Sequence, residues 1–122
     1  PDFSVLDPEL RETIRALGLE GKSAAQVGCN NARELLSLAS LKVIPSVGID
    51  QSGAFLEQGR VLAKAAGLEP RLIEADIYDL PDDVGTFDLV LVTIGVLNWM
   101  PDLGGFFRVV AGLLGPGGHL LV

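Results

Sequence analysis

Apolar residues follow two patterns along the chain, and these patterns predict strands and helices respectively. Short runs that are apolar almost throughout predict strands of a parallel sheet, because such strands are covered on both faces. Stretches in which apolar residues return every three or four positions predict helices with one buried side. The expected strands are 23–27, 46–50, 71–76, 87–93 and 119–122, and the expected helices are 7–18, 31–40, 52–67 and 103–114.

Residues with special backbone or capping preferences mark the ends of the expected helices. Asp7 and Pro8 predict a helix start, because aspartate caps the first free N–H groups and proline fits the first helical position. Gly18 and Gly67 are expected to end the first and third helices, and Asp102 is expected to cap the last one. The residues of helix 52–67 expected to point inward are Phe55, Leu56, Leu62 and Ala66.

The regular alternation of strands and helices predicts the fold class. We expect an α/β fold with a doubly wound, mostly parallel sheet between two layers of helices, of the Rossmann-like kind. The sequence contains no repeat or linker, so residues 1–122 are expected to form one domain. The glycine- and proline-rich segment 115–118 predicts a turn. The last strand runs to Val122 with nothing to cover it, which predicts a domain that is incomplete at its C-terminus.

The composition narrows the range of partners. The chain has 122 residues and a net charge of −7, with scattered basic residues, which argues against binding to a phosphate backbone but is compatible with a cationic ligand. No apolar run approaches the ~18 residues that span a bilayer. The single cysteine, Cys29, excludes an internal disulfide and a cysteine-based zinc site, so no metal is expected. We expect a cytoplasmic protein without nucleic-acid or membrane partners, and its oligomeric state stays open.

The ends of the expected strands carry the candidate chemistry. In open parallel sheets, ligands bind in the crevice at the carboxyl ends of the strands. The first strand ends in a loop of small or turn-forming residues, 28–32, and the second ends in Asp50. A carboxylate about 20 residues beyond such a loop accepts hydrogen bonds from the two ribose hydroxyls of a nucleoside. The slim loop indicates that a ligand approaches its backbone.

A dinucleotide such as NAD is one candidate ligand, and the loop argues against it. The dinucleotide fingerprint needs glycine two and five positions beyond Gly28, where this chain has Asn30 and Arg33. Arginine in the third glycine position is expected to block close packing of the helix on the strand. Tyr78, the single tyrosine, has no lysine near it in sequence, so a reductase Tyr-Lys pair is not evident either. An NAD(P)-binding reductase domain remains an alternative.

The ordered set of strand-end motifs resembles the class I S-adenosylmethionine-dependent methyltransferases, in particular their small-molecule branch. The motifs are QVGCNNA (26–32), GID (48–50), EADIYDLP (74–81), FDLVLVTIGVLNWMPDL (87–103) and LLGPGGHLLV (113–122). The resemblance covers almost the whole chain, and it implies transfer of a methyl group from S-adenosylmethionine to a small-molecule acceptor by in-line displacement. The cofactor-binding residues that it implies are Gln26, Gly28, Asn30, Asp50, Gln51, Asp76, Ile77, Thr93 and Gly95.

In this resemblance, Asp50 holds the ribose, Asp76 and the backbone of Ile77 hold the adenine, and Thr93 and Gly95 line the sulfonium end. Asp50 is expected to contribute little to folding. Two departures from the family pattern, Gln26 for an acid and Asn30 for glycine, keep a third hypothesis open: a degenerate domain that binds a ligand without catalysis. Asparagine tolerates positive φ, so the turn is expected to survive. We also expect Gln26→Glu to leave cofactor binding intact or to improve it.

No catalytic residue is assigned, because the cofactor carries an activated methyl group and positioning of the acceptor supplies much of the rate. Cys29 is expected to be a packed residue rather than a nucleophile. His119 is expected at the start of a strand, away from the ligand-bearing ends, and is also interpreted as structural. Trp99 and Met100 could either close over a ligand or fill apolar space.

Overall fold

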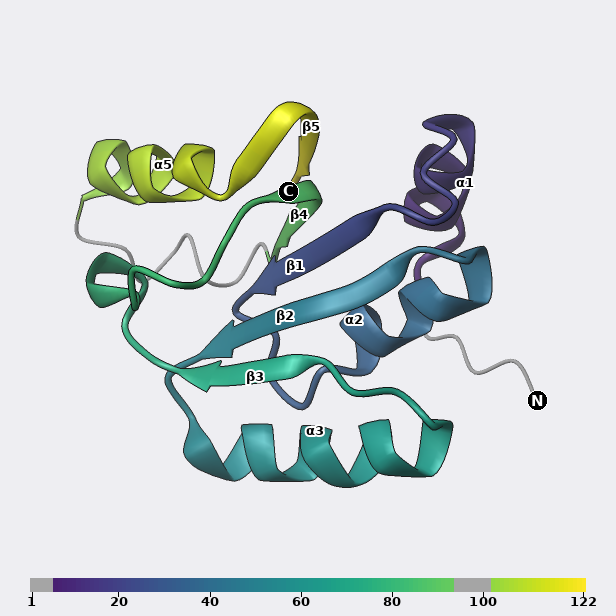
Figure 1. The fold of residues 1–122 in the computed structure, drawn as a ribbon, viewed down its shortest axis with the longest axis horizontal. Helices are drawn as coiled ribbons and strands as arrows, with labels where there is room; N and C mark the ends of the chain where they lie inside the picture. Colours follow the sequence, from purple (N-terminus) through teal and green to yellow (C-terminus); the bar gives the residue numbers. More distant parts are fainter. Residues whose placement is uncertain (1–5, 94–101) are drawn as a thin grey trace.

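The structure, a computed structural model, describes residues 6–93 and 102–122. Its centre is a parallel five-stranded sheet with the strand order β3-β2-β1-β4-β5 (Figure 1). The strands are β1 (Ser23–Val27), β2 (Ile44–Asp50), β3 (Arg71–Glu74), β4 (Phe87–Val92) and β5 (Leu114–Leu121). The chain builds the sheet outward from β1 to β3 and then returns to the other side of β1 with β4. The predicted doubly wound fold is confirmed, and its crevice lies where the strand order reverses, between β1 and β4.

Helices cover both faces of this sheet. They are α1 (Pro8–Ala16), α2 (Arg33–Ser37), α3 (Gly53–Ala66) and α5 (Leu103–Gly112), with 3₁₀ turns η1 (Leu38–Leu41) and η2 (Ile77–Asp79). Buried side chains of α1, α2 and α3 form one apolar cluster with one face of the sheet, and those of α5 and η2 form a second cluster with the other face. The predicted three-layer arrangement is therefore confirmed.

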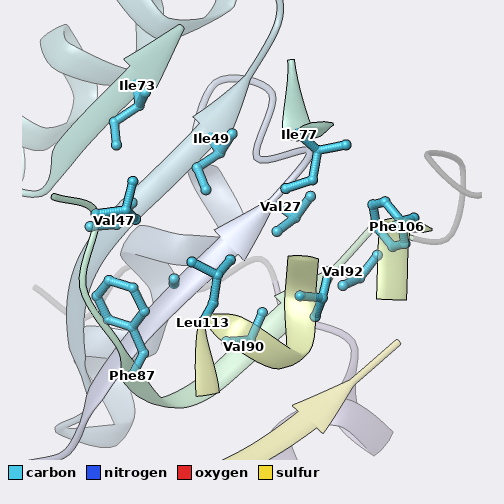
Figure 2. Close-up of a cluster of buried hydrophobic side chains, with 13 residues drawn as sticks. Val27, Val47, Ile49, Ile73, Ile77, Phe87, Val90, Val92, Phe106 and Leu113 are labelled. Carbon is cyan, nitrogen blue, oxygen red and sulfur yellow. The ribbon is translucent and has the colours of Figure 1, made fainter. Parts of the chain in front are cut away.

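The second cluster is packed mostly from β-branched side chains of the central strands. Figure 2 shows Val27 of β1, Ile49 of β2 and Val92 of β4 lying together, with Ile77 of η2 and Phe106 of α5 packed beside them. All of these side chains are at most 4% exposed. The branched residues suit a pleated surface covered on both faces. This packing fixes the carboxyl ends of the three strands relative to one another.

The predicted caps at the starts of α1 and α5 and the glycine that ends α3 are confirmed, whereas α1 ends at Ala16, two residues before Gly18, and α5 ends at Gly112. The Asp7 carboxylate accepts a hydrogen bond from the backbone N–H of Glu9 at 2.8 Å, and Pro8 is the first helical residue. Asp102 caps α5 through the N–H of Gly105 at 3.0 Å. Gly67 ends α3 in the left-handed conformation, with φ of 73°. These side chains and turns supply partners for backbone groups that a helix end leaves unpaired.

The prediction of a turn at 115–118 is wrong, because this segment is part of β5. Leu114 pairs with Phe87, and the register of the two strands then shifts before His119 pairs with Leu89. This irregularity accommodates the glycines, one of which, Gly117, has φ of 74°. His119 consequently lies inside β5 rather than at its start. The segment with the turn signal is therefore contained within the bounds of β5, at the place where the pairing with β4 is irregular.

Two further predictions fail at the level of side chains and boundaries. The expected helix 31–40 consists of the short α2 followed by η1. In α3, Phe55 is 43% exposed and Ala66 is also exposed, and the face toward the sheet is formed by Leu56, Gly59 and Ala63. The sequence-based choice missed this stripe because it gave no weight to glycine, although a glycine lets a helix approach its neighbour closely.

The boundaries of β2, β3 and β4 shift by up to two residues, whereas β5 begins five residues earlier than expected. β2 begins at Ile44 instead of 46, and Pro45 is accommodated by a register irregularity against β1 between Ala24 and Ala25. β3 ends at Glu74 and β4 at Val92, slightly earlier than expected. No helix in the described part of the chain is long and apolar enough to cross a membrane.

Candidate functional site

The loop after β1 contains three residues in the left-handed backbone region at alternate positions. Gly28, Asn30 and Ala32 have φ values of 72°, 51° and 65°. The expectation that asparagine supports a positive φ at position 30 is confirmed. Ala32 is the less favourable residue, because its Cβ crowds the backbone in this conformation. The loop therefore keeps the alternating conformation that glycines would adopt, although two of the three positions are not glycine.

The packing of α3 supplies a second reason for the slimness of this loop. A Cβ atom placed on Gly59 would lie 3.1 Å from the carbonyl oxygen of Asn31 and 3.3 Å from the Cβ of Ala32. Ala32 is fully buried. Small residues at 32 and 59 are thus required by contact between the loop and α3, a requirement that leaves no local pattern in the sequence.

Asp50 joins this loop to the start of α3. One carboxylate oxygen accepts a hydrogen bond from the backbone N–H of Asn30 at 2.8 Å, and the other accepts one from the N–H of Ser52, also at 2.8 Å. The cap of α3 is the Ser52 hydroxyl, which accepts from the N–H of Phe55 at 3.2 Å. Asp50 is therefore not a simple helix cap. Each of its oxygens keeps a lone pair with which it can accept a further hydrogen bond.

Backbone hydrogen bonds at Gly28 and Cys29 attach the start of the loop to the end of β2. The backbone N–H groups of Gly28 and Cys29 both donate to the carbonyl of Ile49, at 2.8 and 3.0 Å. The Cys29 side chain is 3% exposed. Burial raises its pKa to about 12, and the nearby negative charge of Asp50 adds to this effect. A thiol that stays protonated is a poor nucleophile, which agrees with the expected packing role.

Gln26 and Thr93 connect β1 to the end of β4 at the reversal of strand order. The Thr93 hydroxyl donates to the carbonyl oxygen of Gly28 at 2.7 Å. The amide nitrogen of Gln26 donates to this hydroxyl at 3.1 Å and to a carboxylate oxygen of Glu34, in α2, at 3.2 Å. Gln26 is 2% exposed, and its carbonyl oxygen has no hydrogen-bond partner within the described residues.

Glu34 is the residue of this group that sequence reasoning missed. Its carboxylate accepts a hydrogen bond from Gln26, the residue that stands where the family pattern has an acid. The available signal was the exchange itself: a glutamine in place of the acid, followed by a glutamate in the first turn of the next helix. The negative charge is thus displaced from β1 to α2 rather than lost.

The adenine-side candidates follow β3 at the same edge of the sheet. One Asp76 carboxylate oxygen accepts from the N–H of Tyr78 at 2.9 Å and caps η2, while Ile77 is 4% exposed and belongs to the core. The Tyr78 hydroxyl donates to the carbonyl of Asp102 at 2.8 Å, which ties η2 to the start of α5. Gln51 is exposed directly after Asp50.

The structure thus joins Asn30 to Asp50 by a hydrogen bond, and it joins Gln26, Thr93 and Gly28 in a second hydrogen-bonded group. Asp76 and Ile77 follow β3, which lies two strands from β1. Gly95, Trp99 and Met100 lie outside the described residues. The arrangement offers carboxylate acceptors, backbone groups of a left-handed loop and a buried amide oxygen along one edge of the sheet.

Comparison with known proteins identifies methyltransferases as relatives of this chain. Residues 25–122 match a family described as a methyltransferase domain. The chain is 40% identical over 79 residues to a demethylmenaquinone methyltransferase of Thermus thermophilus, covering 62% of this chain and 34% of the relative. It is 29% identical over 102 residues to the 27-O-demethylrifamycin SV methyltransferase of Amycolatopsis mediterranei, covering 82% and 37%. The chain therefore spans about a third of the length of these curated relatives.

Solved structures share the fold. An S-adenosylmethionine-dependent methyltransferase from Clostridium acetobutylicum superposes with a TM-score of 0.80 at 22% identity, over 95% of this chain and 50% of that one. PKMT2 from Rickettsia typhi, solved in complex with AdoHcy, gives a TM-score of 0.74 at 27% identity, over 98% of this chain and 26% of that one. The family match covers most of the chain, and the chain belongs to the family of methyltransferase domains.

Proposed function

We propose that this chain is the cofactor-binding core of an enzyme that transfers a methyl group from S-adenosylmethionine to a small-molecule acceptor. The observation that carries the proposal is the Asp50 carboxylate, held by two backbone N–H groups between the left-handed loop and α3 with lone pairs to spare. This is where the doubly wound fold places a nucleoside ribose. Membership of the methyltransferase domain family supports the same reading.

The residues present fit this cofactor. Asp50 is proposed to accept hydrogen bonds from the ribose hydroxyls, with Gln51 beside it, and Asp76 and the backbone of Ile77 are proposed to bind the adenine. Gly28 and Asn30 would lie along the methionine portion. The buried amide of Gln26, together with Thr93 and Gly95, would line the sulfonium end. The cofactor supplies an activated methyl group when bound, so the chain's own task is to hold and orient the reactants and to exclude water.

The acceptor is proposed to be a small molecule, and the protein is proposed to act in the cytoplasm without a nucleic-acid partner. The names of the two curated relatives support a small acceptor, since one refers to demethylmenaquinone and the other to 27-O-demethylrifamycin SV. The net charge of −7 supports the absence of a nucleic-acid partner.

A degenerate, non-catalytic ligand-binding domain is the second candidate, and Gln26 and Ala32 favour it. Gln26 is a neutral residue where the family pattern has an acid, and Ala32 adopts a left-handed conformation that alanine disfavours. Asn30 is less of an obstacle, since asparagine adopts this conformation readily.

Calorimetric titration of the chain with S-adenosylhomocysteine, and separately with NADH, tests the proposal. We expect saturable binding of S-adenosylhomocysteine at micromolar to millimolar concentration and no binding of NADH. Binding of NADH alone would support a dinucleotide-binding domain instead. Binding of S-adenosylhomocysteine by a longer protein that methylates no small molecule would support the degenerate domain.

A further inference from the structure

A cavity of about 590 Å³ opens beside Gln26 and Thr93, on the face of the sheet that α1 and α2 cover. Its walls come from the first turns of α1 and from the carboxyl ends of β4 and β5. The apolar part of the lining consists of Leu10, Leu91, Val92, Leu121 and Val122. A cavity of this size accommodates a small organic molecule with an apolar body.

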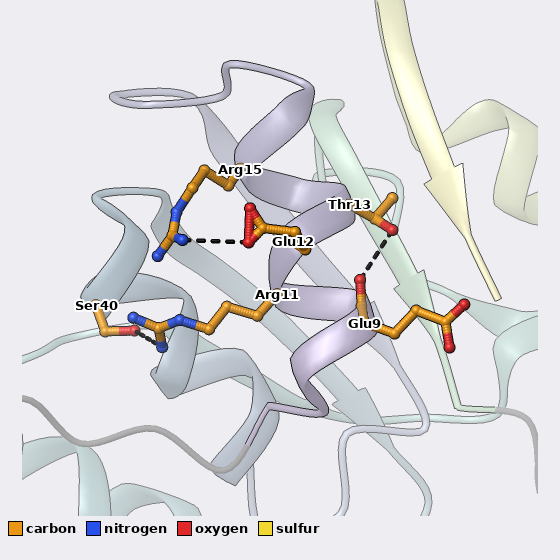
Figure 3. Close-up of polar contacts among 6 residues, drawn as sticks. All are labelled: Glu9, Arg11, Glu12, Thr13, Arg15 and Ser40. Atoms are coloured by element: carbon orange, nitrogen blue, oxygen red, sulfur yellow. Dashed lines mark hydrogen bonds and ion pairs between the residues drawn. The ribbon is translucent and has the colours of Figure 1, made fainter.

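All the charged residues that line this cavity are acidic. Asp7, Glu9 and Glu34 contribute carboxylates, and no lysine, arginine or histidine belongs to the described lining. Figure 3 shows why the helix α1 presents only acids here: Glu9 and Thr13 lie on one side of the helix, whereas Arg15 reaches the other way, toward Glu12. Such a lining favours a positively charged or hydrogen-donating ligand and repels an anion.

The side-chain oxygen of Gln26, which also lines this cavity, lacks a hydrogen-bond donor in the described structure. Glu34 can only accept hydrogen bonds, so the NH₂ group of the Gln26 amide must face it. The Thr93 hydroxyl donates its hydrogen bond to the Gly28 carbonyl and therefore accepts one from the same NH₂ group. These contacts fix the orientation of the amide and leave its oxygen without a partner in the described structure, in a side chain that is 98% buried. A buried acceptor of this kind is unfavourable until a donor reaches it.

We propose that this cavity binds the methyl acceptor, and that the acceptor is an apolar molecule carrying a protonated amino group. The proposal rests on the proposed function, because it assigns the cavity a place beside the reactive methyl group. Gln26 and Thr93 line the cavity and also belong to the expected sulfonium end of the cofactor site. The apolar lining takes the body of the acceptor, and the carboxylates of Glu34, Glu9 and Asp7 together with the Gln26 oxygen take its N–H groups.

Two probes with similar apolar bodies and opposite charges test the proposal: phenethylamine and phenylpropionate. Each is titrated into the chain saturated with S-adenosylhomocysteine, and binding is followed by amide chemical shifts of Thr93, Leu91 and Leu121. We expect the amine to bind at these residues at least about tenfold more tightly than the carboxylate, because the lining carries only negative charge. Displacement of S-adenosylhomocysteine by the amine would assign the cavity to the cofactor's own amino group and overturn the proposal.

Matched variants separate the cavity charge from the general charge of the chain. Glu34→Gln keeps an oxygen that can accept from Gln26, and it should reduce the preference for the amine by about fivefold or more. Glu12→Gln removes the same charge from α1, where the carboxylate pairs with Arg15 at 3.3 Å with both side chains more than half exposed, and it should leave the preference unchanged. A melting curve checks that both variants fold.

The outcomes distinguish this proposal from the proposed function. If S-adenosylhomocysteine binds but the amine does not, or binds no better than the carboxylate, the acceptor assignment is wrong and the proposed function stands. If S-adenosylhomocysteine does not bind, the proposed function fails; binding of the amine would then show a cation site that is not an acceptor site, and the proposal is overturned as well.

Discussion

At the scale of single residues, Asp50 links the candidate site to the stability of its loop. From the sequence, this carboxylate was expected to contribute little to folding, but it accepts hydrogen bonds from the N–H groups of both Asn30 and Ser52. Asp50→Ala removes both acceptors, so we expect a loss of about 1–3 kcal/mol in the free energy of unfolding. Affinity for S-adenosylhomocysteine should fall by about 2–4 kcal/mol, roughly thirty- to a thousandfold, in calorimetry.

Asp83→Ala is the matched control for this prediction. Asp83 carries the same charge but pairs with Arg71 at the amino end of β3, in an exposed ion pair with an N–O distance of 3.1 Å. Its loss should change stability by less than about 1 kcal/mol and leave binding unchanged. Asp50→Asn keeps one acceptor oxygen and should lie between wild type and Asp50→Ala. Normal binding by Asp50→Ala would contradict the ribose assignment.

The pair formed by Gln26 and Glu34 changes the expectation for Gln26→Glu. The sequence alone favoured intact or improved binding, but the Gln26 amide donates to the Glu34 carboxylate at 3.2 Å in a buried position. A glutamate at 26 would place two carboxylates side by side, where they repel each other. We therefore expect the single variant to lose about 1–3 kcal/mol of stability at neutral pH, measured by urea unfolding.

The double variant Gln26→Glu, Glu34→Gln reverses the direction of this hydrogen bond and should restore most of the stability. It also returns the acid to the position that the family pattern gives it, so its affinity for S-adenosylhomocysteine should equal or exceed that of the wild type. A double variant that is no more stable than Gln26→Glu would show that repulsion between positions 26 and 34 is not the cause of the loss.

At the scale of elements, the contact between α3 and the loop depends on the absence of a side chain at Gly59. Gly59→Ala gains about 0.8–1 kcal/mol of helix propensity, but the new Cβ would lie 3.1 Å from the backbone oxygen of Asn31. Overpacking against the backbone costs about 1–3 kcal/mol. We expect a net loss of stability of up to about 2 kcal/mol and weaker cofactor binding, because the loop must shift.

Gly112→Ala is the matched control on α5. A Cβ atom at this position would meet no heavy atom within 4 Å. The substitution should therefore show the propensity gain alone, about 0.5–1 kcal/mol, in the same unfolding experiment. An equal gain in Gly59→Ala would mean that the loop does not rest on α3 as closely as the structure shows.

Elements differ in how far their sequences specify them. Helices with strong end signals, such as α1 with Asp7 and Pro8, could be predicted from local residues, because capping bonds join groups close in sequence. The extent of β5 could not, since Gly115 and Pro116 signal a turn but lie within the strand, where its pairing with β4 is irregular. The buried face of α3 was misjudged for a similar reason: contact with the loop decides that Gly59 faces inward.

At the scale of the whole molecule, the order of the strands creates the candidate site. The chain reverses its direction of growth at β1 and places β4 next to it, so Thr93 reaches the carbonyl of Gly28, 65 positions away in sequence. The same reversal leaves room between α1 and the ends of β4 and β5 for the cavity lined by Gln26 and Glu34. The proposed cofactor site and the proposed acceptor cavity are therefore consequences of one topological feature.

The sequence by itself determined the fold class, most of the elements and the chemistry at the strand ends. Periodicity and capping act locally, and the topology rules for parallel sheets bring the strand ends to one edge. Asp50 and the loop at 28–32 therefore stand out from the order of residues alone. The positive φ of Asn30 was also foreseeable from its side chain.

Only the tertiary structure decided how these groups are connected. It showed that Asp50 holds the loop, that Gly59 and not only a ligand keeps the loop slim, and that Glu34 supplies a charge beside Gln26. It also showed that the oxygen of Gln26 lacks a donor in the described structure and that acids line the cavity. Such pairings depend on distances between elements far apart in sequence, which are set by packing and leave no local pattern.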